Sequence, residues 1–86
     1  MADDPQLADK IIRQCAAALT RDKNDESKTL SVLNDYVIAC KANGHSREEG
    51  LDYLCVDSGC ICEQANMTEE QIVDAERTYN ELWHKL

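Results

Sequence analysis

Apolar residues recur every three to four positions in four stretches of the chain, which is the spacing of one face of an α-helix. No stretch alternates apolar and polar residues with a period of two, so we predict no β-sheet. The pattern predicts helices over residues 5–21, 28–43, 47–65 and 69–85. Residues 1–86 are then expected to form one small all-α domain, a compact four-helix bundle or an orthogonal helical array.

Local signals mark the ends of the first two helices. Asp4 is a suitable N-cap for the first, and Pro5 suits the first helical position because its missing N–H has no partner there anyway. Ser27 or Thr29 is expected to cap the second helix. Gly44 suits the left-handed backbone position that commonly follows a helix.

Two capping boxes predict the starts of the later helices. In each box a Ser or Thr side chain accepts from a backbone N–H three residues on, and a Glu or Gln side chain accepts in return. The sequence has Ser46 with Glu49, and Thr68 with Gln71. The second box opens the most clearly amphipathic stretch of the chain.

The third helical stretch contains Cys55–Cys62, which holds three of the five cysteines. On an unbroken helix with about 100° per residue, Cys55 and Cys62 share the core face and Cys60 points about 140° away. If the helix instead ends at Gly59, Cys60 and Cys62 face the same side, and Cys55 lies on the preceding helical end. The sequence leaves both arrangements open, and a continuous helix removes the possibility of one shared metal ion.

A closed zinc site needs four ligands, and Cys55, Cys60, Cys62 and His45 are the candidates. Their Cys-x4-Cys-x-Cys spacing is not one of the common zinc patterns. Buried packing residues are therefore the preferred interpretation of the cysteines, with no cofactor expected and zinc as the alternative.

The formal net charge is −8, from 17 acidic and 9 basic residues. Negative charge repels phosphate backbones and anionic lipids, so we expect neither direct nucleic-acid binding nor membrane binding. The same charge suits a basic protein partner. Because the N-terminal residues are acidic, unlike those of a secretory signal, a cytoplasmic location is predicted, and the five cysteines leave a secreted form open.

Catalytic patterns are not evident in the sequence. There is no P-loop, dinucleotide-binding glycine motif or His-Glu-x-x-His, and the acidic residues show no pattern that singles out a catalytic pair. An enzyme is therefore not predicted.

The predicted function is that of a small acidic protein–protein interaction domain, an adaptor, regulator or inhibitor that acts by surface binding. Tyr79 and Trp83 are candidate contact residues because such aromatic types are enriched in binding hot spots, and Glu76 and Glu81 lie beside them in the sequence. The alternatives are a metal-binding or thiol-based sensor that uses the cysteine cluster, and an acidic nucleic-acid mimic that blocks a basic partner. Association with a second copy through the apolar second helix is also left open.

Overall fold

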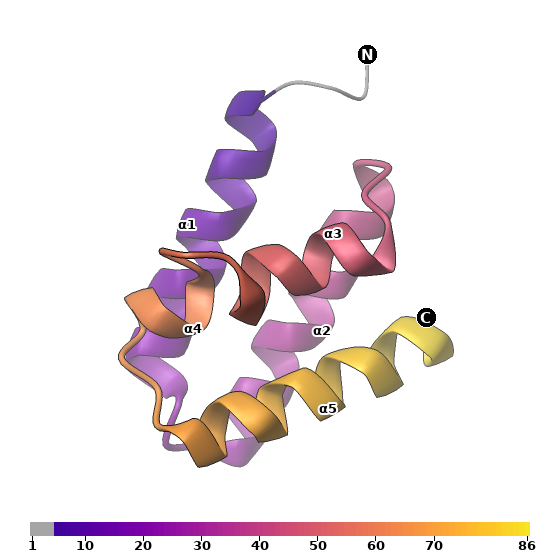
Figure 1. The fold of residues 1–86 in the computed structure, drawn as a ribbon. Coiled ribbons are helices and arrows are strands. Elements are labelled where there is room, and N and C mark those ends of the chain that lie inside the picture. Colours follow the sequence, from indigo (N-terminus) through magenta and orange to yellow (C-terminus); the bar gives the residue numbers. More distant parts are fainter. Residues whose placement is uncertain (1–4) are drawn as a thin grey trace.

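The computed structural model describes the backbone of residues 5–86 and the side chains of residues 9–86. Within this part the chain is helical and contains no strand, which confirms the predicted all-α fold (Figure 1). The elements are α1 (Pro5–Asp22), α2 (Glu26–Ala42), α3 (Arg47–Leu51), a π-helical turn η1 (Asp52–Val56), α4 (Ile61–Gln64) and α5 (Glu69–Lys85).

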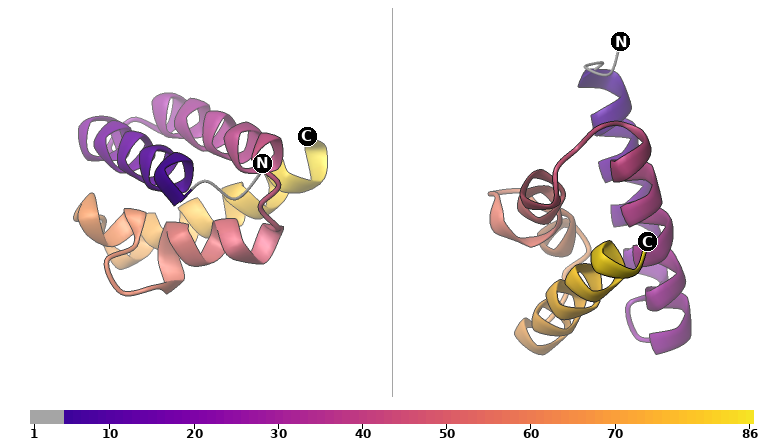
Figure 2. Two further views of the ribbon diagram at one scale, coloured as in Figure 1. Left: turned by 90° about the horizontal axis from the view of Figure 1, so that it is seen from above. Right: turned by 90° about the vertical axis from the view of Figure 1, so that its right-hand side faces the viewer.

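The helices form two layers around one core. α1 and α2 run side by side in opposite directions, and α3, η1, α4 and α5 cover one side of this pair (Figure 2). The core is aliphatic and rich in thiols, and its largest fully buried side chains are Leu19, Leu33, Val37, Cys40, Leu54, Ile61, Cys62 and Tyr79. Between residues 5 and 86, no helix is long and apolar enough to cross a membrane.

The N-terminal cap of α2 differs from the prediction. Asp25 caps this helix, since its carboxylate accepts a 3.2 Å hydrogen bond from the backbone N–H of Lys28. The helix therefore begins at Glu26, and the expectation of a Ser27 or Thr29 cap is wrong. An aspartate at this position also places negative charge at the positive end of the helix dipole. The cap predicted at Asp4 lies outside the described residues.

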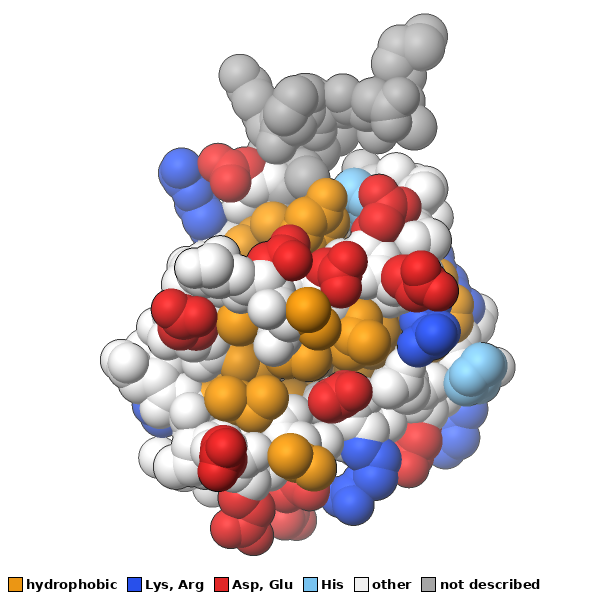
Figure 3. Space-filling view, viewed as in Figure 1, with side chains coloured by type: hydrophobic (Ala, Val, Ile, Leu, Met, Phe, Trp, Pro, Cys, Tyr) orange, Lys and Arg blue, Asp and Glu red, His pale blue; other side chains and the backbone are white. Residues whose placement is uncertain are grey.

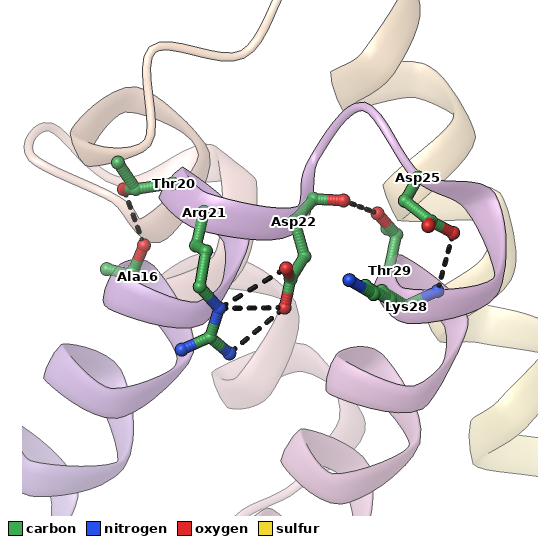
Figure 4. A network of polar contacts seen from close by, with 7 residues as sticks. All are labelled: Ala16, Thr20, Arg21, Asp22, Asp25, Lys28 and Thr29. Carbon is green, nitrogen blue, oxygen red and sulfur yellow. Dashed lines mark hydrogen bonds and ion pairs between the residues drawn. The ribbon is translucent and has the colours of Figure 1, made fainter.

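The turn between α1 and α2 is held by side chains on both helices (Figure 4). The hydroxyl of Thr29 donates a 2.9 Å hydrogen bond to the backbone carbonyl of Asp22. The Arg21 guanidinium bonds to both carboxylate oxygens of Asp22 and holds the pKa of that carboxyl below its usual range. The turn is thereby fixed without any glycine.

Both predicted capping boxes are confirmed. The Ser46 hydroxyl accepts from the N–H of Glu49 at 3.1 Å, and the Glu49 carboxylate accepts from the N–H of Ser46 at 2.9 Å. Thr68 and Gln71 exchange the equivalent bonds at 3.2 and 3.0 Å. Gly44 has a φ of +76°, which is the left-handed conformation expected at the end of α2.

The third predicted helix ends before Gly59, since η1 ends at Val56 and Asp57 is already extended. After α3 the chain widens into η1, where the N–H of Asp57 donates to the carbonyl of Asp52, five residues back, at 2.9 Å. Gly59 then takes a φ of +74°, and Cys60 precedes the short helix α4. A continuous helix over 47–65 is therefore not formed.

Two buried tyrosines bond to the backbone of α3, just before the π-helical turn. The hydroxyl of Tyr36 donates a 2.6 Å hydrogen bond to the carbonyl of Gly50, and that of Tyr79 donates to the carbonyl of Arg47 at 2.8 Å. A regular α-helix would pair the Gly50 carbonyl with the N–H of Leu54. The Tyr36 hydroxyl, which comes from another helix, is thus an additional donor to that carbonyl just before η1 begins.

A second set of contacts joins the connector between α1 and α2 to the segment around the connector between α4 and α5. The Lys23 ammonium donates to the carbonyls of Ala65 and Asn66 at 2.6 and 3.2 Å. The Gln71 amide donates to the side-chain oxygen of Asn24 at 3.0 Å. The α1–α2 and α4–α5 connectors are thus tied together, and this sets the spacing between α4, η1 and α5.

Candidate functional site

An open hollow lies where the end of η1, the turn into α4, and the start of α5 meet. We call it the η1–α5 hollow, and its volume is about 610 Å³. It is lined by Cys55, Val56, Asp57, Ser58, Cys60, Glu63, Asn66, Met67 and Ile72. Val56 and Cys60 both line it, on either side of the turn that separates η1 from α4.

The centre of the hollow is apolar. Met67 and Ile72 are partly buried and pack against the core, and Val56 is 62% exposed. Figure 3 shows apolar side chains gathered in the middle of this face, with several acidic side chains around them and basic ones at the right and lower edges. An exposed apolar patch with a polar rim is typical of a binding surface.

The rim of the hollow is acidic. Asp57 and Glu63 line it, and both are exposed. Burial, followed by the carboxylates of Glu76 and Asp52, raises the pKa of the Cys55 thiol to about 11, which places these two acids close by as well. The ion pairs found among residues 9–86 join Arg13 to Asp9, Arg21 to Asp22, and Arg77 to Asp74. Within those residues, the four acids around the hollow have no ion-pair partner.

The distribution of charge along the sequence indicates this surface, although the overall net charge does not. Residues 47–76 contain nine acidic residues and one basic residue, Arg47. Their net charge of −8 equals that of the whole chain, so the remaining residues are neutral in sum. Charge counted along the chain therefore locates the acidic surface on α3, η1, α4 and the first part of α5.

Two other depressions differ from the η1–α5 hollow in charge. One lies between α1 and α2 and has Arg21 and Lys28 among its lining residues. The other lies between the start of α2 and α5 and includes Lys23 and Arg77. Basic side chains accompany the acidic ones in both, whereas the lining of the η1–α5 hollow contains no basic residue.

The predicted cysteine cluster is only partly brought together. Cys55 and Cys60 line the hollow, while Cys62 is fully buried. The helical projection that turned Cys60 away from the core is wrong, because Cys60 is buried at 8% exposure and Cys55 is the partly exposed thiol. The His45 ring packs edge-on against Tyr53, 5.7 Å between centroids, and does not line the hollow. Among the described residues, no three His, Cys, Asp or Glu side chains are grouped so that they could hold a metal ion.

The thiols of the core are held in the protonated form. Burial raises the pKa of Cys40 to about 11 and that of Cys62 to about 12, and it also raises that of Cys15. At neutral pH such thiols carry little thiolate, which is the nucleophilic form. The arrangement thus favours packing over thiol chemistry.

We expect one cysteine to react first with a thiol reagent under native conditions. Cys55 is the only one of the five that is not buried, so a maleimide should label it before the other four. Its raised pKa should make the reaction slow at pH 7 and faster towards pH 9, since the thiolate fraction grows about tenfold per pH unit. Mass spectrometry of the digested protein checks the order of labelling. Earlier labelling of Cys60 would contradict this placement.

The aromatic residues predicted as contacts lie mainly in the interior. Tyr79 is fully buried, so it offers no surface to a partner in this structure. Trp83 is partly buried, stacks on Tyr79 with 5.8 Å between centroids, and lies under the Lys41 ammonium at 4.9 Å. Glu81 is exposed but does not line the hollow. Of the four predicted contacts, Glu76 is the one placed near the η1–α5 hollow.

Comparisons with protein-family models, with curated proteins and with solved structures found no match to this chain.

Proposed function

We propose that this chain is a small acidic protein-binding module whose contact surface is the η1–α5 hollow. The observation that carries the proposal is an exposed apolar centre surrounded by unpaired carboxylates. The partner that fits this surface is a basic polypeptide segment with an apolar side. Apolar contacts would supply most of the affinity, and the carboxylates would supply steering and register.

The charge distribution supports a basic partner over a second copy. Two copies meeting through this face would bring together two acidic segments, residues 47–76 of each copy, with a net charge of −8 apiece, which opposes association. A segment rich in Lys and Arg is attracted over roughly the 8–10 Å Debye length at physiological salt. Its association should therefore be fast and sensitive to ionic strength.

The apolar centre also favours a protein partner over nucleic-acid mimicry. A mimic of nucleic acid needs carboxylates spaced like phosphates and gains little from an apolar floor. Here Val56, Met67 and Ile72 occupy the middle of the surface, and the acids lie at its edge. Such a centre and rim resemble the anatomy of protein–protein interfaces.

A charge-neutral variant of the hollow tests the proposal. The probe is a synthetic amphipathic peptide of lysine and leucine, and its Kd is measured by fluorescence anisotropy at low salt and at high salt. The variant combines Asp57→Asn, Glu63→Gln and Glu76→Gln, which keep the size of each side chain. We expect it to weaken binding by about tenfold or more, since rim charges contribute modestly but add together.

A matched control separates local charge from net charge. The triple variant Glu26→Gln, Asp35→Asn and Glu81→Gln removes the same amount of charge at exposed positions outside the hollow. It should weaken binding less than threefold. Equal weakening by the two variants would mean that only the net charge matters, and the proposal would then be wrong.

A further inference from the structure

The side chains that line the η1–α5 hollow are unusually rich in sulfur. Cys55, Cys60 and Met67 contribute two thiols and a thioether, and no aromatic ring lines the space. The two methionines of the chain are Met1 and Met67, so Met67 is the single thioether among the described residues. A sulfur-lined apolar surface is polarisable and adapts its shape readily to an incoming side chain.

The aromatic residues of the chain are engaged elsewhere. Tyr36, Tyr79 and Trp83 contact one another in sequence as tilted rings, with ring centroids 5.9 and 5.8 Å apart. Tyr53 packs against His45. The Cys55 thiol lies near Tyr79 on its core side, where it contributes to the raised pKa of that phenol, but no ring lines the hollow itself. Contacts between sulfur and an aromatic ring are favourable at about 5 Å.

We propose that the partner anchors itself in the η1–α5 hollow through an aromatic side chain flanked by basic residues. This inference rests on the proposed function and specifies the partner of the same site. The ring would lie against the sulfur atoms of Met67, Cys55 and Cys60, and the flanking Lys or Arg side chains would reach Asp57, Glu63 and Glu76. Aromatic residues and arginine are also the types most enriched in binding hot spots. The volume of the hollow is ample for one ring and the chain that carries it.

A pair of peptides separates the aromatic contact from simple hydrophobic burial. Both are lysine-rich and differ at one central position, which is phenylalanine in one and cyclohexylalanine in the other. The two rings bury similar area, but only phenylalanine has the π-system that sulfur contacts. We expect the phenylalanine peptide to bind about threefold to tenfold more tightly.

Met67 provides both a variant and a spectroscopic reporter. Met67→Leu conserves volume and should remove most of the preference for phenylalanine, while it leaves the binding of the cyclohexylalanine peptide nearly unchanged. In protein carrying ¹³C-labelled methionine methyl groups, the Met67 signal should shift upfield with the phenylalanine peptide alone, through the ring current. The Met1 signal serves as the internal reference.

The outcomes distinguish this inference from the proposed function. Equal affinity for the two peptides, with an unmoved Met67 signal, overturns the aromatic anchor and leaves the acidic binding surface intact. If neither peptide binds at low salt, the proposed function fails together with the inference. The phenylalanine peptide could also bind more tightly than the cyclohexylalanine peptide to wild type and Met67→Leu alike. That result would overturn the sulfur contact.

Discussion

Alanine in place of Gly50 is expected to destabilise the protein by about 2–3 kcal/mol, although helix propensity alone favours alanine there by about 1 kcal/mol. A Cβ at this position would overlap the hydroxyl oxygen of Tyr79 and lie 3.2 Å from its Cζ and 3.4 Å from the sulfur of Cys40. Tyr79 is fully buried and cannot swing aside. Its displacement would also break the bond from its hydroxyl to the partly buried Arg47 carbonyl.

Chemical denaturation and thermal melting of the Gly50→Ala variant check this expectation. For a domain of this size, the loss corresponds to a decrease in Tm of about 10–20 °C. Gly59→Ala is the matched control, since nothing lies within 4 Å of its Cβ but its φ is +74°. It should cost about 1–2 kcal/mol through backbone strain alone. A Gly50→Ala variant as stable as the wild type would show that the approach of α5 to α3 is looser than the structure indicates.

The fold class was predictable because its determinants are local. Helix caps depend on residues three or four positions apart. Ser46 with Glu49 and Thr68 with Gln71 therefore mark the starts of their helices, whatever those helices pack against. Apolar periodicity likewise depends on neighbours along the chain. The wrong N-cap predicted for α2 is also a local matter. The true cap, Asp25, lies in a run of charged residues, and such a run is equally typical of a solvated connector.

The π-helical turn could not be predicted from local patterns, and the contacts beside it join residues that are distant in the sequence. The bond from Tyr36 to the Gly50 carbonyl joins residues 14 positions apart, and the contact of Tyr79 with Arg47 joins residues 32 apart. No periodicity within residues 47–65 contains this information. A regular helix drawn through that stretch therefore placed Cys60 outwards, whereas the turn at Gly59 brings it inwards.

The candidate site was also predictable only in part. Its charge was available from the sequence, since the acidic residues concentrate between residues 47 and 76. Its apolar centre was not, because η1, the turn into α4 and the start of α5 come together only in the folded chain. The aromatic residues were a poor guide to the site. The chain has four of them, and two, Tyr36 and Tyr79, are buried in the core.

Leu54 and Val56 both lie in η1, but the first is expected to matter for folding and the second for binding. Alanine substitution of each residue separates the two effects. Leu54 is fully buried, so Leu54→Ala leaves a cavity and is expected to cost about 2–5 kcal/mol. Because the whole domain is stabilised by only about 5–15 kcal/mol, much of its stability would be lost. Urea denaturation followed by circular dichroism measures the change, and a cost below 1 kcal/mol would contradict the placement of Leu54 in the core.

Val56, two residues on, is the matched control and also a test of the site. At 62% exposure, Val56→Ala should change the free energy of unfolding by less than about 0.5 kcal/mol. The same variant should weaken binding of the phenylalanine peptide by about threefold to tenfold, because it removes apolar surface from the η1–α5 hollow. If Val56→Ala leaves that affinity unchanged, the peptide does not contact this side of the hollow. If Leu54→Ala weakens binding only in proportion to the unfolded fraction, Leu54 acts through stability alone, and the two faces of one turn serve two separate purposes.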